Sequence, residues 1–523
     1  MHLSEQNDLI KRRLEELEEI KKLGINPYPH RFDVENNSAD IVKNFKDPET
    51  DEDKEKLKEV TVTVAGRIMA IRKMGKATFC HIKDDTGRIQ IYIRKDDVGE
   101  EAYSVFKLLD IGDIIGVKGY AFRTKTGEVS VHAVTYQLLT KSIQPLPVVK
   151  EEITESGEKI IYDAFADVEL RYRQRYIDLI VNENVKDTFV KRTKIIQSIK
   201  RTLEKNNFFE VETPTLQSIY GGANAKPFIT HHNALDIDLY LRISNELYLK
   251  RLIVGGFNRV YEFVRDFRNE GIDRTHNPEF TQVEWYQAYG DYFDSMNLFE
   301  EVVEQACIDI HGTTKVMYGE TELDFKRPWK RIRMTDAIQQ KTGLDVLNIK
   351  KDEIINYMNT NGIKFDTKIS HSKGLIIAAL FEETCEDELI QPTFVYDFPI
   401  DTTPLCKQHR DYDVSKLDEM KNDPEQVILA ERFEPYANKW ELGNSYTELN
   451  DPVLQRKLLE EQVERGRGGE EETHPLDDDF INAIEVGMPP TTGVGMGVDR
   501  IVMLLTNSQT IRDVIFFPLM KPV

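Results

Sequence analysis

A chain of 523 residues is long enough for two to four domains, each with its own hydrophobic core. Its 40% hydrophobic and 31% charged residues are typical of a soluble protein, and no run of about 18 apolar residues is present that could span a bilayer. The net charge of −22 argues against a general affinity for polyanions, so a nucleic-acid partner would need a local basic surface.

The N-terminus mixes both charge signs and has no apolar core, which is typical of neither a secretory signal nor a transit peptide. We therefore expect a cytoplasmic protein with no membrane partner. The cysteines are far apart and form no CxxC pair, which favours reduced thiols over a disulfide framework or a zinc site. The four are Cys80, Cys307, Cys385 and Cys406.

Residues 5–23 carry apolar side chains at three- and four-residue spacing, which predicts one amphipathic helix that ends at Gly24. Its polar face includes Arg12 and Arg13 and could contact RNA, although an ordinary solvated face is the favoured interpretation. This helix and the segment after it form a predicted N-terminal region, residues 1–58.

From 59 to 142 the apolar period changes to two, which predicts five strands separated by turns such as DDTG and KTGE. A helical stretch, EEAYSVFKLLD, falls between the third and fourth strands. This order predicts an OB-fold β-barrel, whose exposed strands commonly bind single-stranded nucleic acid through basic and aromatic side chains. Side chains of these types are Arg72, Lys73, Lys76, Phe79, Arg88 and Gln90. Many small barrels bind no nucleic acid, so the barrel alone leaves this function open.

Residues 143–165 contain prolines and polar residues and are interpreted as a linker. The remainder, 166–523, is predicted to be one large α+β domain. Within it, about 330–390 has helical periodicity and no strand pattern, which indicates a helical insertion.

Charges crowd the stretch RDFRNEGIDRTHNPEFTQVE, residues 265–284, between two apolar segments. A solvated hairpin tip is one interpretation. Strand alternation instead places Glu262, Val264 and Arg268 on one face of a first strand. On the second strand it groups Phe280, Gln282, Glu284 and Tyr286. An arginine, an aromatic ring, carboxylates and a phenol on one side suit a nucleotide together with a cationic small molecule.

Near the C-terminus, Gly493, Gly495 and Gly497 alternate before an apolar helix that contains Arg500. The pattern is not GxGxxG, which argues against a dinucleotide-binding fold. Glycines on one strand face let a flat group approach the backbone, and Arg500 could lie over that group. Close packing of helix on strand is the alternative.

The stretch ERFEPYANKWELGNSYTELND places Glu434 and Glu441 where two carboxylates could hold Mg²⁺ through a triphosphate. Asn444, Tyr446 and Glu448 share a strand face there. Separated carboxylates in a strand are usually solvated, so these residues alone leave the metal site open.

Together these stretches resemble the signature motifs of class II aminoacyl-tRNA synthetases, and the order of barrel and catalytic domain resembles the subgroup for lysine, aspartate and asparagine. The chain is most similar to the lysyl-tRNA synthetases over nearly its whole length. The ordered matches are GGANAKPFITHHNALDIDLYLRI, ELYLKRLIVGGF, FRNEGI with HNPEFT, IQPTFVYDFP, ELGNSYTELND and GVGMGVDRIVMLLTNSQTIRDVIFFP.

The resemblance implies a catalytic domain with a six-stranded antiparallel sheet flanked by helices, in a homodimer with Pro214 at the subunit contact. It also implies the reaction. Lysine and Mg²⁺-bound ATP give lysyl-adenylate and pyrophosphate, and the lysyl group then moves to the 3′ end of lysine tRNA. Catalysis in such a reaction is mostly positioning and charge stabilisation.

Site residues follow from the resemblance by matched position. Arg268 is implied to bind the α-phosphate and the lysine carboxylate, and Arg500 to lie on the adenine near the γ-phosphate; both are the catalytic candidates. The residues implied for ATP are Arg268, Glu270, His276, Phe280, Glu434, Glu441 and Arg500, with Glu434 and Glu441 holding Mg²⁺. Those implied for the α-amino and carboxylate end of lysine are Gly222, Glu246, Arg268 and Asn444. Those implied for its ε-ammonium are Glu284, Tyr286 and Glu448. Those implied for the anticodon are Arg72, Phe79 and Gln90.

The chain departs from the family pattern at two places. It has SNELYLK where the family usually has APELYLK, and IDTTPL where the family has a pattern such as EVSPL. Glu246 is kept, and Asp401 and Thr403 are close replacements.

Two other functions are compatible with parts of the sequence. A relative that lysylates a protein would share the catalytic domain, but such relatives lack the barrel. A non-catalytic tRNA-binding protein need not keep Arg268, Glu434, Glu441 and Arg500 together.

Overall fold

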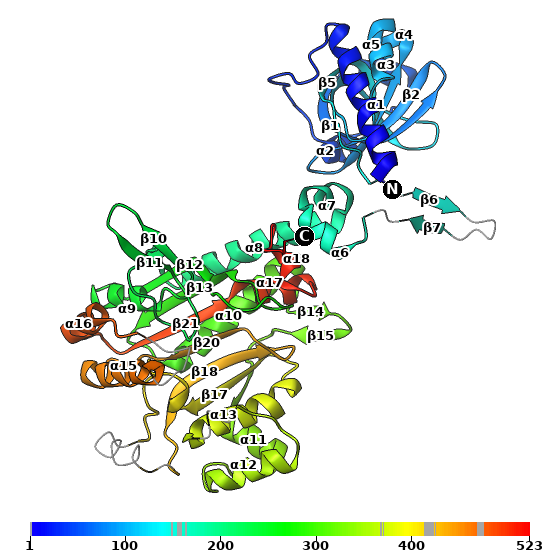
Figure 1. Cartoon of the computed structure of the whole chain (residues 1–523). Helices are drawn as coiled ribbons and strands as arrows, with labels where there is room; N and C mark the ends of the chain where they lie inside the picture. Colours follow the sequence, from blue (N-terminus) through cyan, green and yellow to red (C-terminus); the bar gives the residue numbers. More distant parts are fainter. Residues whose placement is uncertain are drawn as a thin grey trace. The chain divides into compact units, whose positions relative to one another are not determined.

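The computed structural model describes residues 3–147, 150–153, 159–162, 165–366, 369, 371–412, 423, 425–467 and 475–522 (Figure 1). The chain divides into two compact units, Met1–Arg171 and Tyr172–Val523. Among the helices so described, none is long and apolar enough to cross a membrane.

The first unit is a closed five-stranded barrel with strand order β1-β2-β3-β5-β4, and the predicted OB fold is confirmed. Alternate side chains on its strands, such as Ile82 and Ile91, are fully buried inside. The strands are β1 Val62–Met74, β2 Ala77–Lys83, β3 Arg88–Arg94, β4 Ile114–Arg123 and β5 Val129–Thr140. The helices are α1 Leu3–Lys22, α2 Ser38–Asn44, α3 Asp51–Glu59, α4 Lys95–Val98 and α5 Glu100–Phe106.

Part of the basic face of α1 has a structural use. Arg13 is only 5% exposed, and its guanidinium donates to the backbone carbonyls of Ile111, Ser142 and Gln144 at 2.9–3.2 Å. Arg12 pairs with Asp110 at 2.6 Å. Arg13 therefore attaches the helix to the barrel, because a buried guanidinium group needs acceptors, and the exposed Arg12 adds an ion pair.

Two short pairings occur where the sequence predicted none. Strands β6 Lys150–Ile153 and β7 Lys159–Tyr162 form an antiparallel pair in the predicted linker. Strand β16 Lys330–Arg333 pairs in parallel with β17 Thr393–Pro399, at the start of the predicted helical insertion. The other elements described in this insertion are helices, namely α11 Met334–Thr342, α12 Lys351–Thr360, α13 Lys373–Thr384 and η2 Glu386–Glu388. Four-residue strands are too short to produce a recognisable alternation.

A nine-stranded sheet forms the centre of the second unit, and the predicted α+β class is confirmed. Six neighbouring strands, β17-β18-β20-β21-β13-β12, run antiparallel. At the two edges, β16 pairs in parallel with β17 and β8 pairs in parallel with β12. The bounds are β8 Phe209–Glu210, β12 Arg259–Phe267, β13 Glu279–Ala288, β18 Leu429–Ala437, β19 Trp440–Glu441, β20 Gly443–Thr447 and β21 Thr491–Gly497.

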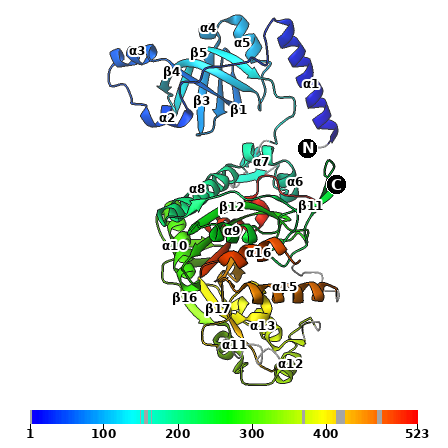
Figure 2. The ribbon, with the colours of Figure 1, turned by 90° about the vertical axis from the view of Figure 1, so that its left-hand side faces the viewer.

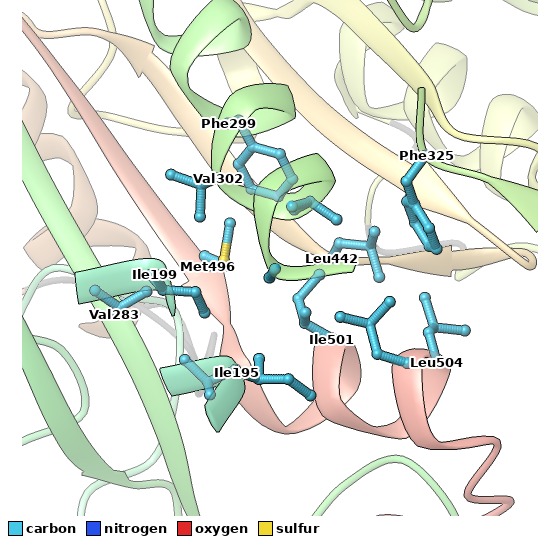
Figure 3. Close-up of a cluster of buried hydrophobic side chains, with 14 of the residues drawn as sticks. Ile195, Ile199, Val283, Phe299, Val302, Phe325, Leu442, Met496, Ile501 and Leu504 are labelled. Carbon is cyan, nitrogen blue, oxygen red and sulfur yellow. The ribbon is translucent and has the colours of Figure 1, made fainter. Parts of the chain in front are cut away.

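One face of this sheet is covered by α8 Glu183–Lys205, α10 Tyr292–His311 and α17 Val498–Thr506, as Figure 3 shows. Ile199, Phe299 and Ile501 from these helices meet Val283 and Met496 from the sheet. Because side chains alternate along a strand, the residues next to Val283 and Met496 point to the other face. That other face carries Glu284, Gly495 and Gly497.

Helices α9 Glu246–Val254 and α16 Asp478–Gly487 lie side by side in the second unit (Figure 2). The remaining helices are α6 Val168–Arg173, α7 Arg175–Val181, α15 Pro452–Arg467, α18 Ile511–Val514 and η3 Ile400–Thr402. The remaining strands are β9 Leu216–Gln217, β10 Ile229–His232, β11 Ile237–Leu241, β14 Lys315–Tyr318 and β15 Thr321–Asp324.

Candidate active site

A cavity of about 380 Å³ opens on the sheet face that carries Glu284 and the glycines. Most of the residues that the sequence analysis predicted for the ATP and lysine sites line this cavity, and they come from five separate stretches of the chain. These are Gly222, Glu246, Arg268, Glu270, His276, Phe280, Glu284, Tyr286, Glu441, Asn444 and Arg500. Glu434 and Glu448 are buried beside it and do not line it.

The glycine row of β21 forms the floor of this cavity. Gly493 pairs with Tyr286 of β13 and with Tyr446 of β20, and Gly495 pairs with Glu284. A Cβ atom on Gly493 would overlap the Tyr286 ring and the Glu448 carboxylate. The glycines therefore leave room between two rows of polar side chains, which favours the pocket interpretation over simple helix packing at Gly493.

One end of the cavity is acidic. Glu284 is 3% exposed and accepts hydrogen bonds from Ser244 Oγ at 3.0 Å, Gln282 Nε2 at 2.8 Å and Tyr286 OH at 3.2 Å. Burial raises the pKa of Glu284 well above its usual value, and the nearby carboxylates of Asp266 and Glu246 raise it further. A cation bound here would relieve that repulsion.

Lys250 of α9 joins two of the nominated carboxylates, a contact that the sequence interpretation missed. Its Nζ lies 2.6 Å from Glu246 Oε1 and also pairs with Glu448. Glu246 Oε1 accepts a second hydrogen bond, from Tyr446 OH at 2.7 Å. The spacing of four residues between Glu246 and Lys250 was the available signal, because such residues share a helix face.

The other end of the cavity carries two arginines and an aromatic ring. Arg268 Cζ lies 5.1 Å from the centre of the Phe280 ring. Arg500 donates to the Glu441 carbonyl at 2.5 Å and contacts His276 Nε2 at 3.1 Å. Two guanidinium groups beside a half-buried ring that lines the cavity can bind phosphates and stack on a base.

Arg432 is a second residue that the sequence interpretation missed. It donates to Asn444 Oδ1 at 3.0 Å and to Thr402 Oγ1 at 2.7 Å, and it pairs with Glu434. The sequence signal for Arg432 was its position two residues before Glu434, because residues two apart on a strand share one face. Arg432 and Thr402 also line a neighbouring cavity of about 300 Å³, into which Glu434 faces.

The two carboxylates nominated for a metal, Glu434 and Glu441, are close enough to repel each other. Burial raises the pKa of Glu434 to about 7 against the opposing effect of Arg432, and Glu441 adds to the rise. A divalent cation would hold Glu434 ionised, so the pair fits such an ion. Within the described residues, no three side chains of the metal-ligating types form a ready cluster.

Asp266, in β12, is buried beneath this site. Both of its carboxylate oxygens lack a hydrogen-bond partner among the described residues, although Arg242 Nε lies 3.6 Å away. Burial raises its pKa from 3.8 to about 7, and Arg268 and Arg242 only partly oppose this. Between pH 3.8 and about pH 7, Asp266 keeps its proton in the folded chain and has lost it in the unfolded chain. The free energy of unfolding therefore falls as the pH rises through this range.

Replacing Asp266 with asparagine is therefore expected to stabilise the protein at pH 8 by on the order of 1 to 4 kcal/mol. The asparagine stays neutral, so it avoids the cost of the buried charge. Melting temperatures of the variant and the wild type at pH 5 and pH 8 test this. The gain should be larger at pH 8, and an equal shift at both pH values would contradict it.

The nominated barrel residues lie on its outer face. Arg72 pairs with Phe79, and Phe79 pairs with Tyr92, whose rings are 4.7 Å apart. Gln90 bonds to Glu128 and to Ser130. The rings of Phe122 and His132, which the sequence analysis did not predict for this surface, lie next to Tyr92. The Tyr120 ring stacks on His132.

Comparison with known proteins agrees with both units. A family model described as tRNA synthetases class II (D, K and N) matches residues 167–521, and one described as an OB-fold nucleic acid binding domain matches residues 62–139. A lysine–tRNA ligase of Porphyromonas gingivalis is 50% identical over 529 residues, which cover 100% of this chain and 86% of the relative. A lysine–tRNA ligase of Pelotomaculum thermopropionicum is 50% identical over 517 residues, which cover 99% of this chain and 95% of the relative. A lysine–tRNA ligase of Clostridium novyi is 47% identical over 522 residues, which cover 99% of this chain and 96% of the relative.

Proposed function

The chain belongs to the class II tRNA synthetases of the aspartate, lysine and asparagine group, and from this we propose that it is a lysine–tRNA ligase. It activates L-lysine with ATP to lysyl-adenylate, releases pyrophosphate, and transfers the lysyl group to the 3′ end of lysine tRNA with release of AMP. Its proposed compartment is the cytoplasm, where tRNA is charged for translation.

The acidic end of the cavity carries this proposal. Glu246, Glu284 and Glu448 are each no more than 4% exposed and belong to one cluster. A pocket for aspartate or asparagine would need a cation or an amide facing the substrate side chain. Buried carboxylates left without an ammonium partner are costly, so neutral and acidic amino acids are excluded.

In this proposal Glu246 and the backbone of Gly222 bind the α-ammonium of lysine, and Glu284, Tyr286 and Glu448 bind the ε-ammonium. Gly222 supports this arrangement because a Cβ atom there would lie only 3.0 Å from Glu246 Cβ, and its φ of +85° also favours glycine. The deep position of Glu448 is compatible with a long side chain that extends over Gly493.

Arg268 binds the lysine carboxylate and the α-phosphate, with Asn444 assisting at the carboxylate. A carboxylate oxygen of lysine attacks the α-phosphorus, and the bond to the pyrophosphate oxygen breaks. Negative charge on the α-phosphoryl oxygens is stabilised by the Arg268 guanidinium, which is already in place. In the second step a terminal ribose hydroxyl of the tRNA attacks the lysyl carbonyl, and AMP leaves.

ATP is proposed to lie between Phe280 and Arg500, with its adenine stacked between the ring and the guanidinium. Glu270 and His276 lie in the loop over the triphosphate, and Arg500 reaches the γ-phosphate. The contact between Arg500 and His276 supports this arrangement, since it joins the loop to α17.

Glu434 and Glu441 would hold Mg²⁺, which neutralises charge on the triphosphate when bound. The repulsion between the two carboxylates supports this role. Glu441 reaches the substrate cavity itself, while Glu434 also pairs with Arg432 and accepts from Tyr436 OH at 2.6 Å.

The outer face of the barrel is proposed to bind the anticodon of lysine tRNA. Arg72 supplies charge for the phosphates, and Phe79, with the Tyr92 ring beside it, supplies a stacking surface for bases. Gln90 supplies hydrogen-bonding groups near them.

A homodimer is proposed for the second unit, with Pro214 at the contact. Strand β8 is an edge strand, and its Phe209 is 60% exposed and stacks on Phe257, itself 42% exposed, at 5.7 Å. Exposed aromatic side chains on an edge strand favour pairing with a second copy. Sedimentation equilibrium, with Phe209→Lys as the disrupting variant, measures this directly.

Replacing Glu448 with glutamine is expected to lower lysine-dependent ATP–pyrophosphate exchange by at least about tenfold, because a charge-assisted contact to the ε-ammonium is lost. The assay is steady-state exchange at saturating ATP over a range of lysine concentrations. Near wild-type exchange would remove Glu448 from the lysine site.

Charging of tRNA with each amino acid in turn tests the proposed function. Lysine alone should be transferred, at a rate that depends on ATP and on lysine tRNA. Labelling of a protein in place of tRNA would indicate a protein lysylase, which the barrel argues against. Binding of tRNA with no adenylate formation would indicate a non-catalytic protein.

A further inference from the structure

Lys250 is a fully buried lysine that the proposed mechanism does not use. It lies on α9 with 0% exposure, and its ammonium faces the rings of Tyr446 and Phe480 at 5.5 and 5.9 Å from their centres. Its Nζ contacts Glu246 on its own helix and Glu448, which follows β20. Lysine is almost never fully buried unless it is paired, so the position needs a reason.

Electrostatics keep this ammonium charged. Burial alone lowers the pKa of Lys250, but Glu246 and Glu448 outweigh burial and raise the pKa to about 12. Burial raises the pKa of Glu448, the neighbouring Lys250 ammonium lowers it, and Glu246 raises it. Without Lys250, Glu448 would therefore keep its proton to a higher pH.

The bridge leaves binding capacity on both carboxylates. Glu246 uses Oε1 for Lys250 and Tyr446, while Glu448 Oε1 accepts no hydrogen bond from a described residue and lies beside Gly493. Gly493 lines the floor of the cavity, so this oxygen lies directly behind that floor. The bridge therefore fixes both carboxylates and still leaves oxygen atoms for a substrate.

Charge balance points to a function for the bridge. Three buried carboxylates, Glu246, Glu284 and Glu448, together with the one ammonium of Lys250 leave two negative charges when all are ionised. L-Lysine brings two ammonium groups that balance these charges, and its carboxylate is proposed to pair with Arg268. A pocket with three unbalanced carboxylates would instead take up a proton and lose one charged contact.

We propose that Lys250 is a positioning residue that sets the charge of the amino-acid pocket, because it holds Glu448 ionised and orients Glu448 and Glu246 for the two ammonium groups of L-lysine. The inference rests on the proposed function. Three other ionisable groups around Glu448 are neutral at working pH. They are Tyr286 and Tyr446, whose phenol pKa values are raised by burial, and Cys406, whose thiol pKa is raised by burial and by Glu448.

Replacing Lys250 with methionine is expected to raise KM for lysine at least about tenfold at pH 7.5, with a smaller change in kcat. The decisive measurement is the number of protons released when lysine binds, from calorimetry in two buffers of different ionisation enthalpy. The variant should release up to about one proton more than the wild type, because the ε-ammonium displaces the proton from Glu448. The ratio of the two KM values should fall as the pH rises from 7 to 9.

Two further variants keep the test decisive if the methionine variant does not fold. Lys250→Arg keeps the charge and should release as many protons as the wild type, even if its KM rises through altered geometry. The double variant Lys250→Met with Glu448→Gln removes the group that gains the proton, so the extra proton release should disappear.

Lys373 provides a matched control for the loss of a buried ammonium. It is 3% exposed on α13, and its Nζ donates to the carbonyls of Leu347 at 3.0 Å and Glu425 at 3.1 Å. Lys373→Met should lower the melting temperature and leave KM for lysine and the proton count unchanged.

A wild-type KM and a wild-type proton count in folded Lys250→Met would overturn the inference, as would extra proton release in Lys250→Arg. Failure of the proposed function has a different outcome. In that case the wild-type protein itself shows no lysine-dependent exchange.

Discussion

Replacing Arg268 with alanine is expected to lower lysine-dependent ATP–pyrophosphate exchange by about 10² to 10³-fold, the effect typical of losing one preorganised donor to developing charge. Arg268 lines the cavity, and its guanidinium lies 5.1 Å from the centre of the Phe280 ring. From there one guanidinium can contact the attacking carboxylate and the α-phosphate together. The loss should therefore appear in kcat as well as in KM, because both the orientation of the reactants and the charge of the transition state depend on it.

Arg265 is the matched control for this prediction. It lies three residues earlier on β12, faces away from the cavity, and pairs with Glu279 at 3.0 Å on the surface. Arg265→Ala should leave exchange close to the wild-type rate. Arg268→Lys should recover little of the lost rate, since lysine cannot make the two parallel contacts of a guanidinium. Equal effects of the Arg265 and Arg268 variants would disprove the assignment.

Much of this site could be predicted from strand alternation. Arg268 follows β12, and Glu284 and Tyr286 were assigned to one face of β13 because side chains alternate, and the cavity lies on that face. The glycine row was separated from its buried neighbours Val494 and Met496 by the same rule. The resemblance to the family supplied the antiparallel sheet that joins these strands, which local periodicity does not encode.

The contacts that the sequence did not predict depend on tertiary neighbours. Lys250 looks like an ordinary polar position of an amphipathic helix, and only the packing of α9 against Tyr446 and Phe480 makes it buried. Arg432 lines both cavities, whereas Glu434, which is on the same strand and pairs with Arg432, lines only the second one. Neither the depth of a side chain nor the identity of its partner follows from spacing along one strand.

The departure SNELYLK acquires a physical explanation from the structure. Ser244 donates to Glu284 at 3.0 Å, and Asn245 donates to Glu262 at 2.7 Å. Both replacements therefore place a hydrogen-bond donor against a buried carboxylate. Such donors stabilise the ionised form, in a region where carboxylates outnumber cations.

Replacing Gly493 with alanine is expected to raise KM for lysine by about 100-fold, because a misplacement of about 1 Å can cost that much. The added Cβ would overlap the Tyr286 ring and the Glu448 carboxylate, and both would have to move. These are two of the three residues proposed for the ε-ammonium. Neither can move freely, since Tyr286 is 3% and Glu448 1% exposed.

Gly497→Ala in the same strand separates this local effect from a general effect of alanine in β21. A Cβ there would meet only Leu442 O at 3.6 Å and Arg500 Cδ at 3.9 Å, which are ordinary contacts. Its KM for lysine should stay within about threefold of the wild type, while KM for ATP reports any movement of Arg500. A folded Gly493→Ala protein with an unchanged KM for lysine would show that the ε-ammonium does not lie over this glycine. In that case Glu448 would act only through Lys250, as part of the buried bridge.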